Sequence, residues 1–333
     1  MNNADTLDAR LSADGLAWAQ RLVRFNTVSH ESNLGVIECI ADHLRTLGVV
    51  PRITWDDERR KANLFATLGE GRPDGLILSG HTDTVPWDGQ AWSMDPLSGE
   101  VRDGRLYARG SADMKGFIGL ATSQARDFLE ADLPFAVHLA FSYDEEVGCF
   151  GVRHLIADLK EAGLAPRLCI VGEPTGMIPA IAHKGVHRWR CCVRGKAAHS
   201  SQTTSAVNAI EAAARVVARV ADLADDLRNN EPRQEGFDVP FSTAAVCVVQ
   251  GGIADNVVPE DCRFHYEFRN LPGADEVAMQ RLVAEHAAAL EPAMKAVDPT
   301  SGFRFEQTAS IPAFQVDPGD PAVQLAQRLA GVD

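Results

Sequence analysis

The sequence is poor in positive charge for its length. Its 333 residues include 32 Lys and Arg against 46 Asp and Glu, which gives a formal net charge of −14. Nucleic acids and anionic membranes bind proteins that present clustered Lys and Arg. The charge balance therefore argues against both kinds of partner, and it indicates an acidic surface that favours solubility. The length is sufficient for two domains.

Cysteine is also scarce, and its seven positions include no Cys-x-x-Cys pair. An odd number of cysteines, several of them in apolar strand-like runs, is typical of buried free thiols in a reducing compartment. The segment from Met1 to Asp8 has no basic stretch followed by an apolar one, and no apolar run approaches the length of a membrane span. These absences predict a cytoplasmic protein.

Several common catalytic motifs are missing as well. The chain has no Gly-x-Ser-x-Gly, no His-Glu-x-x-His, no Walker loop and no dinucleotide fingerprint. Cys191 and Cys192 lie within an alternating strand pattern, which favours core packing over a nucleophilic role. The sequence therefore does not predict a serine hydrolase, a nucleotide-dependent enzyme or a cysteine nucleophile.

Strand-like and helix-like segments alternate over the first half of the chain. Apolar spacing predicts helices at 11–23 and 34–47, strands at 63–68 and 76–79, a helix after Asp113, a strand at 137–143, a helix at 152–161 and a strand at 168–171. Strands that alternate with helices form crossover units in a parallel sheet. The predicted fold class of this part is α/β with a mostly parallel sheet.

The pattern changes near His183. From there the chain reads as strand, helix, strand, strand, helix and strand, at 186–193, 206–228, 243–250, 261–269, 274–290 and 303–307. This βαββαβ order predicts a small α+β module inserted into the first domain, to which a helix at 321–330 would return the chain. The expected domains are residues 1–183 with 309–333, and residues 184–308.

Residues that can bind metals follow the predicted strands of the first domain or begin its helix. They are His81 with Asp83, Asp113, the pair Glu145 and Glu146, and Glu173. Because the carboxyl ends of parallel strands meet at one edge of a sheet, these side chains can converge on one point. One imidazole with several carboxylates suits zinc, and a surplus of carboxylates suits two metals that share a bridging ligand. The placement predicts a metallohydrolase.

Each candidate also has an ordinary structural explanation. His81 can be a hydrogen-bonded loop residue, and Asp113 can be a helix N-cap. The pair Glu145–Glu146 and the single Glu173 can be acidic residues of surface turns. On the other side, Asp83 can orient the imidazole, and one glutamate of the pair can bind metal while the other deprotonates water. The occurrence of all these sites in one chain favours the metal centre.

Five motifs, in order along nearly the whole chain, carry a resemblance to a known family. They are Gly80-His-Thr-Asp83, the segment from Arg105 to Gly116, Asp144-Glu-Glu146, Val171-Gly-Glu-Pro-Thr175 and Ala198-His-Ser-Ser201. Together they resemble the aminoacylase/acetylornithine deacetylase/succinyl-diaminopimelate desuccinylase family. Within it, the acetylornithine deacetylases are most similar at Ala182-His-Lys-Gly185, Val239-Pro-Phe-Ser-Thr243, Gly251-Gly252, and Arg269 followed by Leu271-Pro-Gly273.

The resemblance implies a zinc-hydrolase catalytic domain with two zinc ions and an inserted domain that acts as a lid and forms a homodimer. It implies that His81 and Glu173 bind one zinc, that Glu146 binds the other, and that Asp113 bridges the two. Co²⁺ is a possible substitute for Zn²⁺ in such a site.

The resemblance also implies roles beyond metal binding. Glu145 would be the general base, and Asp83 would steady His81. From the inserted domain, His199 would reach a partner's active site and stabilise the tetrahedral oxyanion. Asn256 and Arg269 would help to bind the substrate.

One ligand of the family has no counterpart. The family takes its last zinc ligand from a histidine near the C-terminus, whereas the last histidine here is His286, inside a predicted helix of the inserted domain, and the chain ends at Asp333. The resemblance therefore implies a C-terminally truncated member. We expect one zinc to be held firmly and the second weakly or not at all.

The predicted function is the hydrolysis of N2-acetyl-L-ornithine to L-ornithine and acetate, in arginine biosynthesis, by a zinc-dependent amidohydrolase. Two alternatives remain open. One is another N-acyl amino acid amidohydrolase such as succinyl-diaminopimelate desuccinylase, in which the acyl pocket meets a second carboxylate instead of a methyl group. The other is a truncated, non-catalytic homologue that only binds or dimerises.

Overall fold

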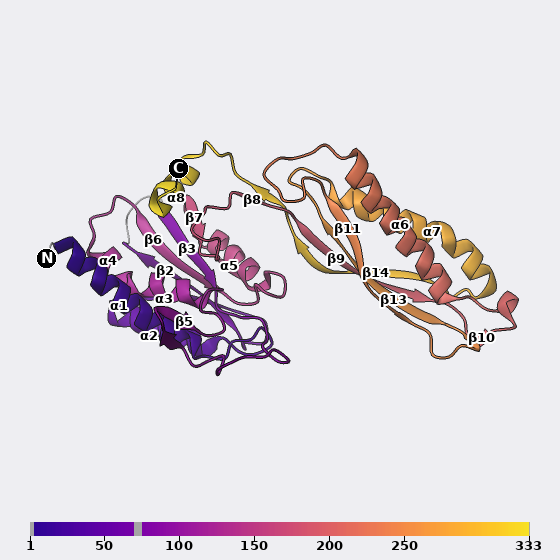
Figure 1. The fold of residues 1–333 in the computed structure, drawn as a ribbon, viewed down its shortest axis with the longest axis horizontal. Coiled ribbons are helices and arrows are strands. Elements are labelled where there is room, and N and C mark those ends of the chain that lie inside the picture. Colours follow the sequence, from indigo (N-terminus) through magenta and orange to yellow (C-terminus); the bar gives the residue numbers. More distant parts are fainter. Residues whose placement is uncertain (1–2, 70–74, 333) are drawn as a thin grey trace. The chain divides into compact units, whose positions relative to one another are not determined.

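The computed structural model describes residues 3–69 and 75–332. The chain divides into two compact units, Met1–Pro179 with Gln324–Asp333, and Ala180–Val323 (Figure 1). The sequence pattern placed the inserted segment at 184–308 instead. The difference arises because β8 (Ala182–His183) pairs with β15 (Phe314–Gln315). The two segments that connect the units therefore both belong to the second unit.

A five-stranded sheet with the order β1-β2-β6-β3-β7 forms the centre of the first unit. Its strands are β1 (Arg52–Trp55), β2 (Ala62–Leu68), β3 (Gly75–His81), β6 (Ala136–Ser142) and β7 (Leu168–Val171). β3 is parallel to β6 and β7, whereas β2 is antiparallel to β6 and to β1. The α/β fold class is confirmed, with the refinement that the sheet is mixed at the side of β1 and β2.

Helices cover both faces of this sheet, as Figure 1 shows. α1 (Asn3–Val23), α2 (Leu34–Thr46), α3 (Lys115–Ser123) and α4 (Ala125–Glu130) lie on one face, and α5 (Phe150–Glu161) lies on the other. Side chains alternate between the faces of a strand. Accordingly, Leu64 of β2 joins the first helical layer, while the neighbouring Phe65 packs with Leu155 of α5. β6 is buried along its whole length because helices cover both of its faces.

The second unit contains a four-stranded antiparallel sheet with the order β11-β13-β9-β14. Its main elements are β9 (Val186–Arg194), α6 (Ala209–Asn230), β11 (Thr243–Gly251), β13 (Asp261–Arg269), α7 (Glu276–Val297) and β14 (Gly302–Ile311). This is the predicted βαββαβ order. The buried face of β13 carries Phe264, Tyr266 and Phe268, which pack with buried residues of α6 and α7 such as Val216 and Val283.

The remaining described elements are short. They are β4 (Glu100–Arg102), β5 (Arg105–Tyr107), β10 (Ala198–His199), η1 (Thr203–Ser205), β12 (Val257–Val258) and α8 (Pro321–Ala330). The predicted helix at 321–330 is therefore α8. Within residues 3–69 and 75–332, no helix has both the length and the apolar character needed to cross a bilayer.

Candidate metal centre

His81, the last residue of β3, lies at the centre of the cluster of candidate ligands. Its side chain is 2% exposed, and its Nε2 lies 2.9 Å from Oδ1 of Asp113. The same nitrogen lies 3.6 Å from a carboxylate oxygen of Glu173 and 3.9 Å from one of Glu145. These carboxylates are 36% to 49% exposed. A buried imidazole therefore faces a group of partly solvated carboxylates.

The strand register explains why residues so far apart in sequence meet. His81 pairs with Ser142 at the end of β6, and the turn that carries Glu145 and Glu146 begins directly after it. On the other side of β3, Ser79 pairs with Val171 of β7, and the N–H of Gly172 donates to the Ser79 carbonyl at 3.1 Å. The carboxyl ends of three parallel strands thus meet at one edge of the sheet, as the sequence predicted.

Asp113 does not cap the helix that follows it. The N-cap of α3 is Met114, and no side chain makes a cap hydrogen bond there. Instead, Asp113 lies in a tight loop in which the N–H of Gly116 donates to the carbonyl of Gly110 at 3.2 Å. A Cβ at Gly116 would lie 2.1 Å from the Ser111 carbonyl oxygen, so this close approach requires glycine. The loop brings the carboxylate of Asp113 to the imidazole of His81.

In the described part of the chain, one group of three potential ligands is close enough to share an ion. Ligand atoms of His81, Asp113 and Glu146 all lie within 4.8 Å of one another. Glu173 is a fourth potential ligand, and a third oxygen donor, close to the same imidazole. One nitrogen with several carboxylate oxygens is a donor set that zinc accepts, and imidazole also suits other divalent transition metals.

The protonation energetics of these side chains fit a bound cation. Burial raises the pKa of Glu173 to about 7, with the charges of Asp113, Glu145 and Glu146 adding to the rise and that of His81 opposing it. Burial and the charge of Asp113 also raise the pKa of Glu146. Carboxylates gathered in this way repel one another in their charged forms. A divalent cation at this place would relieve that repulsion.

The pKa of His81 is raised as well, which for an imidazole favours the charged form. Burial alone would lower its pKa, but the hydrogen bond and charge of Asp83, together with the charges of Glu145 and Glu173, raise the pKa to about 10. Its Nδ1 lies 3.0 Å from the main-chain carbonyl of Asp83 and 3.5 Å from the carboxylate of the same residue. These contacts orient the ring so that Nε2 faces the other carboxylates.

The buried carboxylate of Asp83 also holds the neighbouring turn. Its oxygens accept hydrogen bonds from the main-chain N–H groups of Glu145 at 3.1 Å and Glu146 at 3.3 Å. The Ser29 hydroxyl donates to it at 2.7 Å. Burial would raise the pKa of Asp83, but its hydrogen bonds with His81 and Ser29 lower it below the usual range. One side chain therefore connects β3, the turn after β6 and the segment around Ser29.

The turn itself depends on a residue that the sequence analysis did not assign. Asp144 has φ +54°, a left-handed conformation that is uncommon outside glycine. Its carboxylate accepts a hydrogen bond from Nζ of Lys61 at 2.6 Å, and the same ammonium group donates to the Ser29 carbonyl. The reversal at Asp144 directs the next two N–H groups toward Asp83. Lys61 thus stabilises the turn that carries the two glutamates.

A second layer of buried polar contacts supports the end of β3. Nζ of Lys115 donates to the Phe25 carbonyl at 2.8 Å and to the Thr27 hydroxyl at 3.1 Å, and that hydroxyl donates to the Thr82 carbonyl at 2.7 Å. Asn33 donates to the Thr82 hydroxyl at 2.9 Å. Burial lowers the pKa of Lys115 to about 7. Sequence reasoning placed Lys115 in a motif but gave it no role, and it missed the other partners.

Three further predicted site residues belong to the second unit. His199 ends β10, where its Nδ1 lies 2.9 Å from the Ser201 hydroxyl. Asn256 is close by, because its carbonyl accepts the N–H of Ser200 at 2.9 Å. Arg269 is the last residue of β13 and pairs with Glu267 at 2.9 Å. The structure thus brings His199 and Asn256 together near the start of β13 and places Arg269 at its other end.

Comparison with known proteins agrees with this architecture. Residues 77–330 match the model of a family described as Peptidase family M20/M25/M40. The fold is similar to that of an M20 family metallo-carboxypeptidase from Sulfolobus solfataricus, with 17% identity, a TM-score of 0.75, and coverage of 96% of this chain and 84% of that chain. It is also similar to human carnosine dipeptidase 1, with 17% identity, a TM-score of 0.65, and coverage of 96% and 83%.

A third similar structure is a dinuclear metal-binding peptidase of the M20 family from Bacillus subtilis. Its identity is 16% and its TM-score is 0.62, with coverage of 98% of this chain and 81% of that chain. These structural likenesses show a shared fold.

We predict that Asp83→Asn weakens zinc binding by about 10- to 100-fold, the typical effect of removing a carboxylate that orients a ligand. An asparagine at position 83 loses the negative charge beside His81 and replaces one acceptor oxygen by a donor. Zinc titration by calorimetry measures the change. Asp88→Asn, an exposed position, is the matched control. Unchanged zinc affinity in a folded Asp83→Asn protein would contradict the role given to Asp83.

A second prediction concerns metal stoichiometry and pH. If His81, Asp113 and Glu173 bind one zinc, a second ion has only Glu146 and the shared Asp113 as ligands, which predicts one tightly bound zinc per chain and a weakly bound second ion. His81, with a pKa of about 10, carries a proton at pH 7 that a metal must displace, and Glu173, with a pKa of about 7, is partly protonated. Zinc binding should therefore release about one to two protons, and its affinity should rise with pH.

Calorimetry in two buffers of different ionisation enthalpy measures both quantities in one protein preparation. Two tight sites of similar affinity would contradict the predicted stoichiometry. Zinc binding without proton release at pH 7 would contradict the protonation assigned to His81 and Glu173.

Proposed function

Since the chain belongs to Peptidase family M20/M25/M40 and is a metal-dependent amidohydrolase, we propose that it hydrolyses N2-acetyl-L-ornithine to L-ornithine and acetate, as a step of arginine biosynthesis. The observation that carries this proposal is the position of Glu145 beside a buried imidazole and several carboxylates at one sheet edge. The choice of substrate rests on the motifs that most resemble acetylornithine deacetylases, among them Ala182 to Gly185 and Val239 to Thr243.

We assign the metal ligands from the geometry together with the family resemblance. His81 and Glu173 would hold one zinc, Glu146 would hold another, and Asp113, which lies next to His81 and in the same group as Glu146, would bridge them. Zinc in such a site supplies a Lewis acid that polarises the amide carbonyl and makes water acidic near neutral pH. The remaining chemistry belongs to side chains of this chain.

Glu145 is placed to move the proton. Its side chain is 40% exposed, with one carboxylate oxygen 3.9 Å from Nε2 of His81 and the other accepting the Cys149 thiol at 3.5 Å. The thiol contact and the bond from its own N–H to Asp83 hold the carboxylate toward the centre. In this proposal, Glu145 accepts a proton from the attacking water while the water oxygen bonds to the carbonyl carbon. It then gives that proton to the amide nitrogen as the C–N bond breaks.

The proposed contribution of the second unit requires two copies of the chain. His199 and Asn256 lie near the first residue of β13, whereas Arg269 is its last residue. A nine-residue strand spans about 27 Å between its first and last residues. A single active site that uses both His199 and Arg269 would therefore take them from different copies.

An exposed edge supports the proposed homodimer. β11 is an edge strand of the four-stranded sheet, and its Val248 and Val249 are 39% and 55% exposed. Ile253, just beyond the strand, is 88% exposed. An edge strand with unpaired backbone groups and apolar side chains is a template for pairing with a second strand. Pairing with β11 of another copy would cover both the backbone groups and the apolar side chains.

We predict that Glu145→Gln lowers kcat on N2-acetyl-L-ornithine by about 10²- to 10⁴-fold, as expected for the loss of a general base. Zinc content should stay close to that of the wild type, because Glu145 is not assigned as a ligand. Steady-state kinetics with metal analysis tests this, and Glu38→Gln on the exposed side of α2 is the matched control. A mutant with wild-type kcat would remove Glu145 from the mechanism.

The same assay decides the substrate. Turnover of an N-succinyl amino acid such as N-succinyl-LL-diaminopimelate in preference to N2-acetyl-L-ornithine would replace the proposed substrate by the alternative one.

A further prediction tests the composite site. His199→Ala should lower kcat with little change in bound zinc, and loss of one oxyanion donor costs about 3–4 kcal/mol in a comparable site. Mixing His199→Ala chains with Glu145→Gln chains should restore activity, because each heterodimer then contains one site with both residues intact. A verified heterodimer without recovered activity would show that His199 does not act across the dimer.

A further inference from the structure

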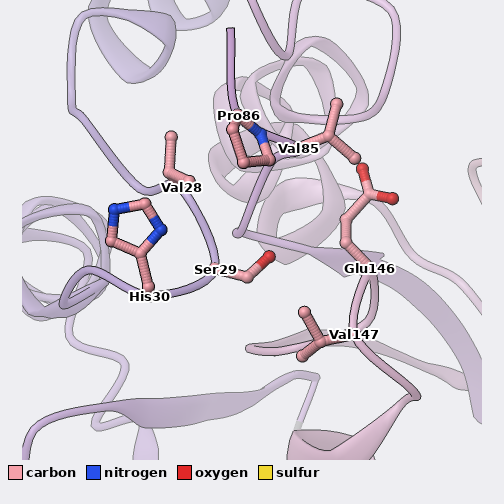
Figure 2. A pocket seen from close by; sticks show the side chains of 7 residues that line it. All are labelled: Val28, Ser29, His30, Val85, Pro86, Glu146 and Val147. Atoms are coloured by element: carbon pink, nitrogen blue, oxygen red, sulfur yellow. The ribbon is translucent and has the colours of Figure 1, made fainter. Parts of the chain in front are cut away.

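A cavity of about 210 Å³ lies beside the metal centre (Figure 2). Its lining residues are Val28, Ser29, His30, Val85, Pro86, Glu146 and Val147. Glu146 belongs both to this lining and to the group of ligand atoms with His81 and Asp113. Glu146 therefore connects the cavity to the candidate metal centre.

The walls of the cavity come from the segments that hold the metal ligands. Val28 forms a parallel β-bridge with Thr84, and the N–H of Ser29 donates to the Thr84 carbonyl at 3.1 Å. This places the segment of Val28 beside that of Val85. Val147 follows Glu146 in the turn that Asp83 holds by two hydrogen bonds. The position of the cavity relative to the ligands is thus fixed by the main chain.

The lining is mostly apolar. Val28, Val85, Pro86 and Val147 supply carbon surface, and Val85 and Val147 remain 37% and 45% exposed in the described chain. The Ser29 hydroxyl is already used by Asp83. No Lys or Arg is among the described residues of the lining. Its one basic side chain is that of His30, whose Nε2 already lies 3.6 Å from the carboxylate of Glu31.

We propose that this cavity is the acyl subsite, and that it selects short apolar acyl chains over acyl chains that end in a carboxylate. The inference rests on the proposed function, because it assumes an N-acyl amino acid as substrate. Of the two substituents on the scissile amide of such a substrate, the amine side carries the α-carboxylate and the acyl side is apolar. Only the acyl side matches the lining.

The same lining disfavours a succinyl group. A second carboxylate in the cavity would lie near Glu146 and would lose solvation without gaining a lysine or arginine partner. Size does not decide between the two, because a cavity of about 210 Å³ has room for more than a methyl group. Acyl chains longer than acetyl should therefore fit.

Hydroxamates test the subsite independently of turnover, since their head group binds a metal and their tail takes the place of the acyl chain. The probes are aceto-, propiono- and butyrohydroxamate and succinic monohydroxamate, titrated into the zinc-loaded protein. Affinity should rise about fourfold for each added methylene that is buried. Succinic monohydroxamate should bind more weakly than butyrohydroxamate. Equal affinities along the alkyl series, or tighter binding of the succinic probe, would overturn the proposal.

Two substitutions at Val85 test whether the tails of these probes occupy the cavity. Val85→Phe should fill the cavity and abolish the gain per methylene, and Val85→Lys should reverse the preference between the butyric and succinic probes. Val50→Phe and Val50→Lys, at a position that is 85% exposed and outside the lining, are the matched controls. If both Val85 variants bind the four probes as the wild type does, the acyl chain lies elsewhere.

Turnover assays separate this proposal from the proposed function. If the hydroxamate series behaves as expected but no N-acyl amino acid is hydrolysed, the cavity is an apolar subsite and the proposed reaction is wrong. If N2-acetyl-L-ornithine is hydrolysed but Val85→Phe leaves both the probe series and the acyl-chain preference unchanged, the reaction stands and the acyl subsite is wrong.

Discussion

The buried carboxylate of Asp83 is the interaction on which the rest of the centre depends. A charged group with so little exposure is tolerated only when hydrogen bonds replace its hydration, and here a hydroxyl and two main-chain N–H groups do so next to an imidazole. The hydroxyl and the N–H groups come from two segments that are distant from Asp83 in the sequence. Satisfying one carboxylate therefore also fixes the end of β3, the turn after β6 and the segment at Ser29.

The centre itself works against the stability of the fold. Several carboxylates share a small volume with one imidazole, and their pKa values are raised where burial and mutual repulsion combine, as at Glu146 and Glu173. Active sites commonly retain such unfavourable arrangements because a ligand or ion compensates for them when it binds. The buried hydrogen bonds of Lys115 and Asn33 stabilise the end of β3 and so offset part of this repulsion.

The candidate ligands could be predicted from the sequence because they obey a rule of topology. His81 ends β3, and Glu146 and Glu173 follow β6 and β7; the carboxyl ends of these strands must meet if the strands are parallel, and they are parallel. Ser29 and Lys61 could not be predicted in this way, because they act on a carboxylate and on main-chain groups and lie in no periodic pattern. β1 was missed because its exposure does not alternate, and α7 extends beyond the predicted end because it continues through Pro292.

The strand β13 has a consequence beyond its place in the core. It separates the pair His199 and Asn256 from Arg269, so its residue count sets the distance between them in any recognition surface that uses both ends. An insertion of two residues would preserve the alternation of buried and exposed side chains, yet would increase that distance by about 7 Å and shift the pairing with β9 and β11. The nine-residue length of β13 is therefore a quantity on which function, as well as folding, can place a constraint.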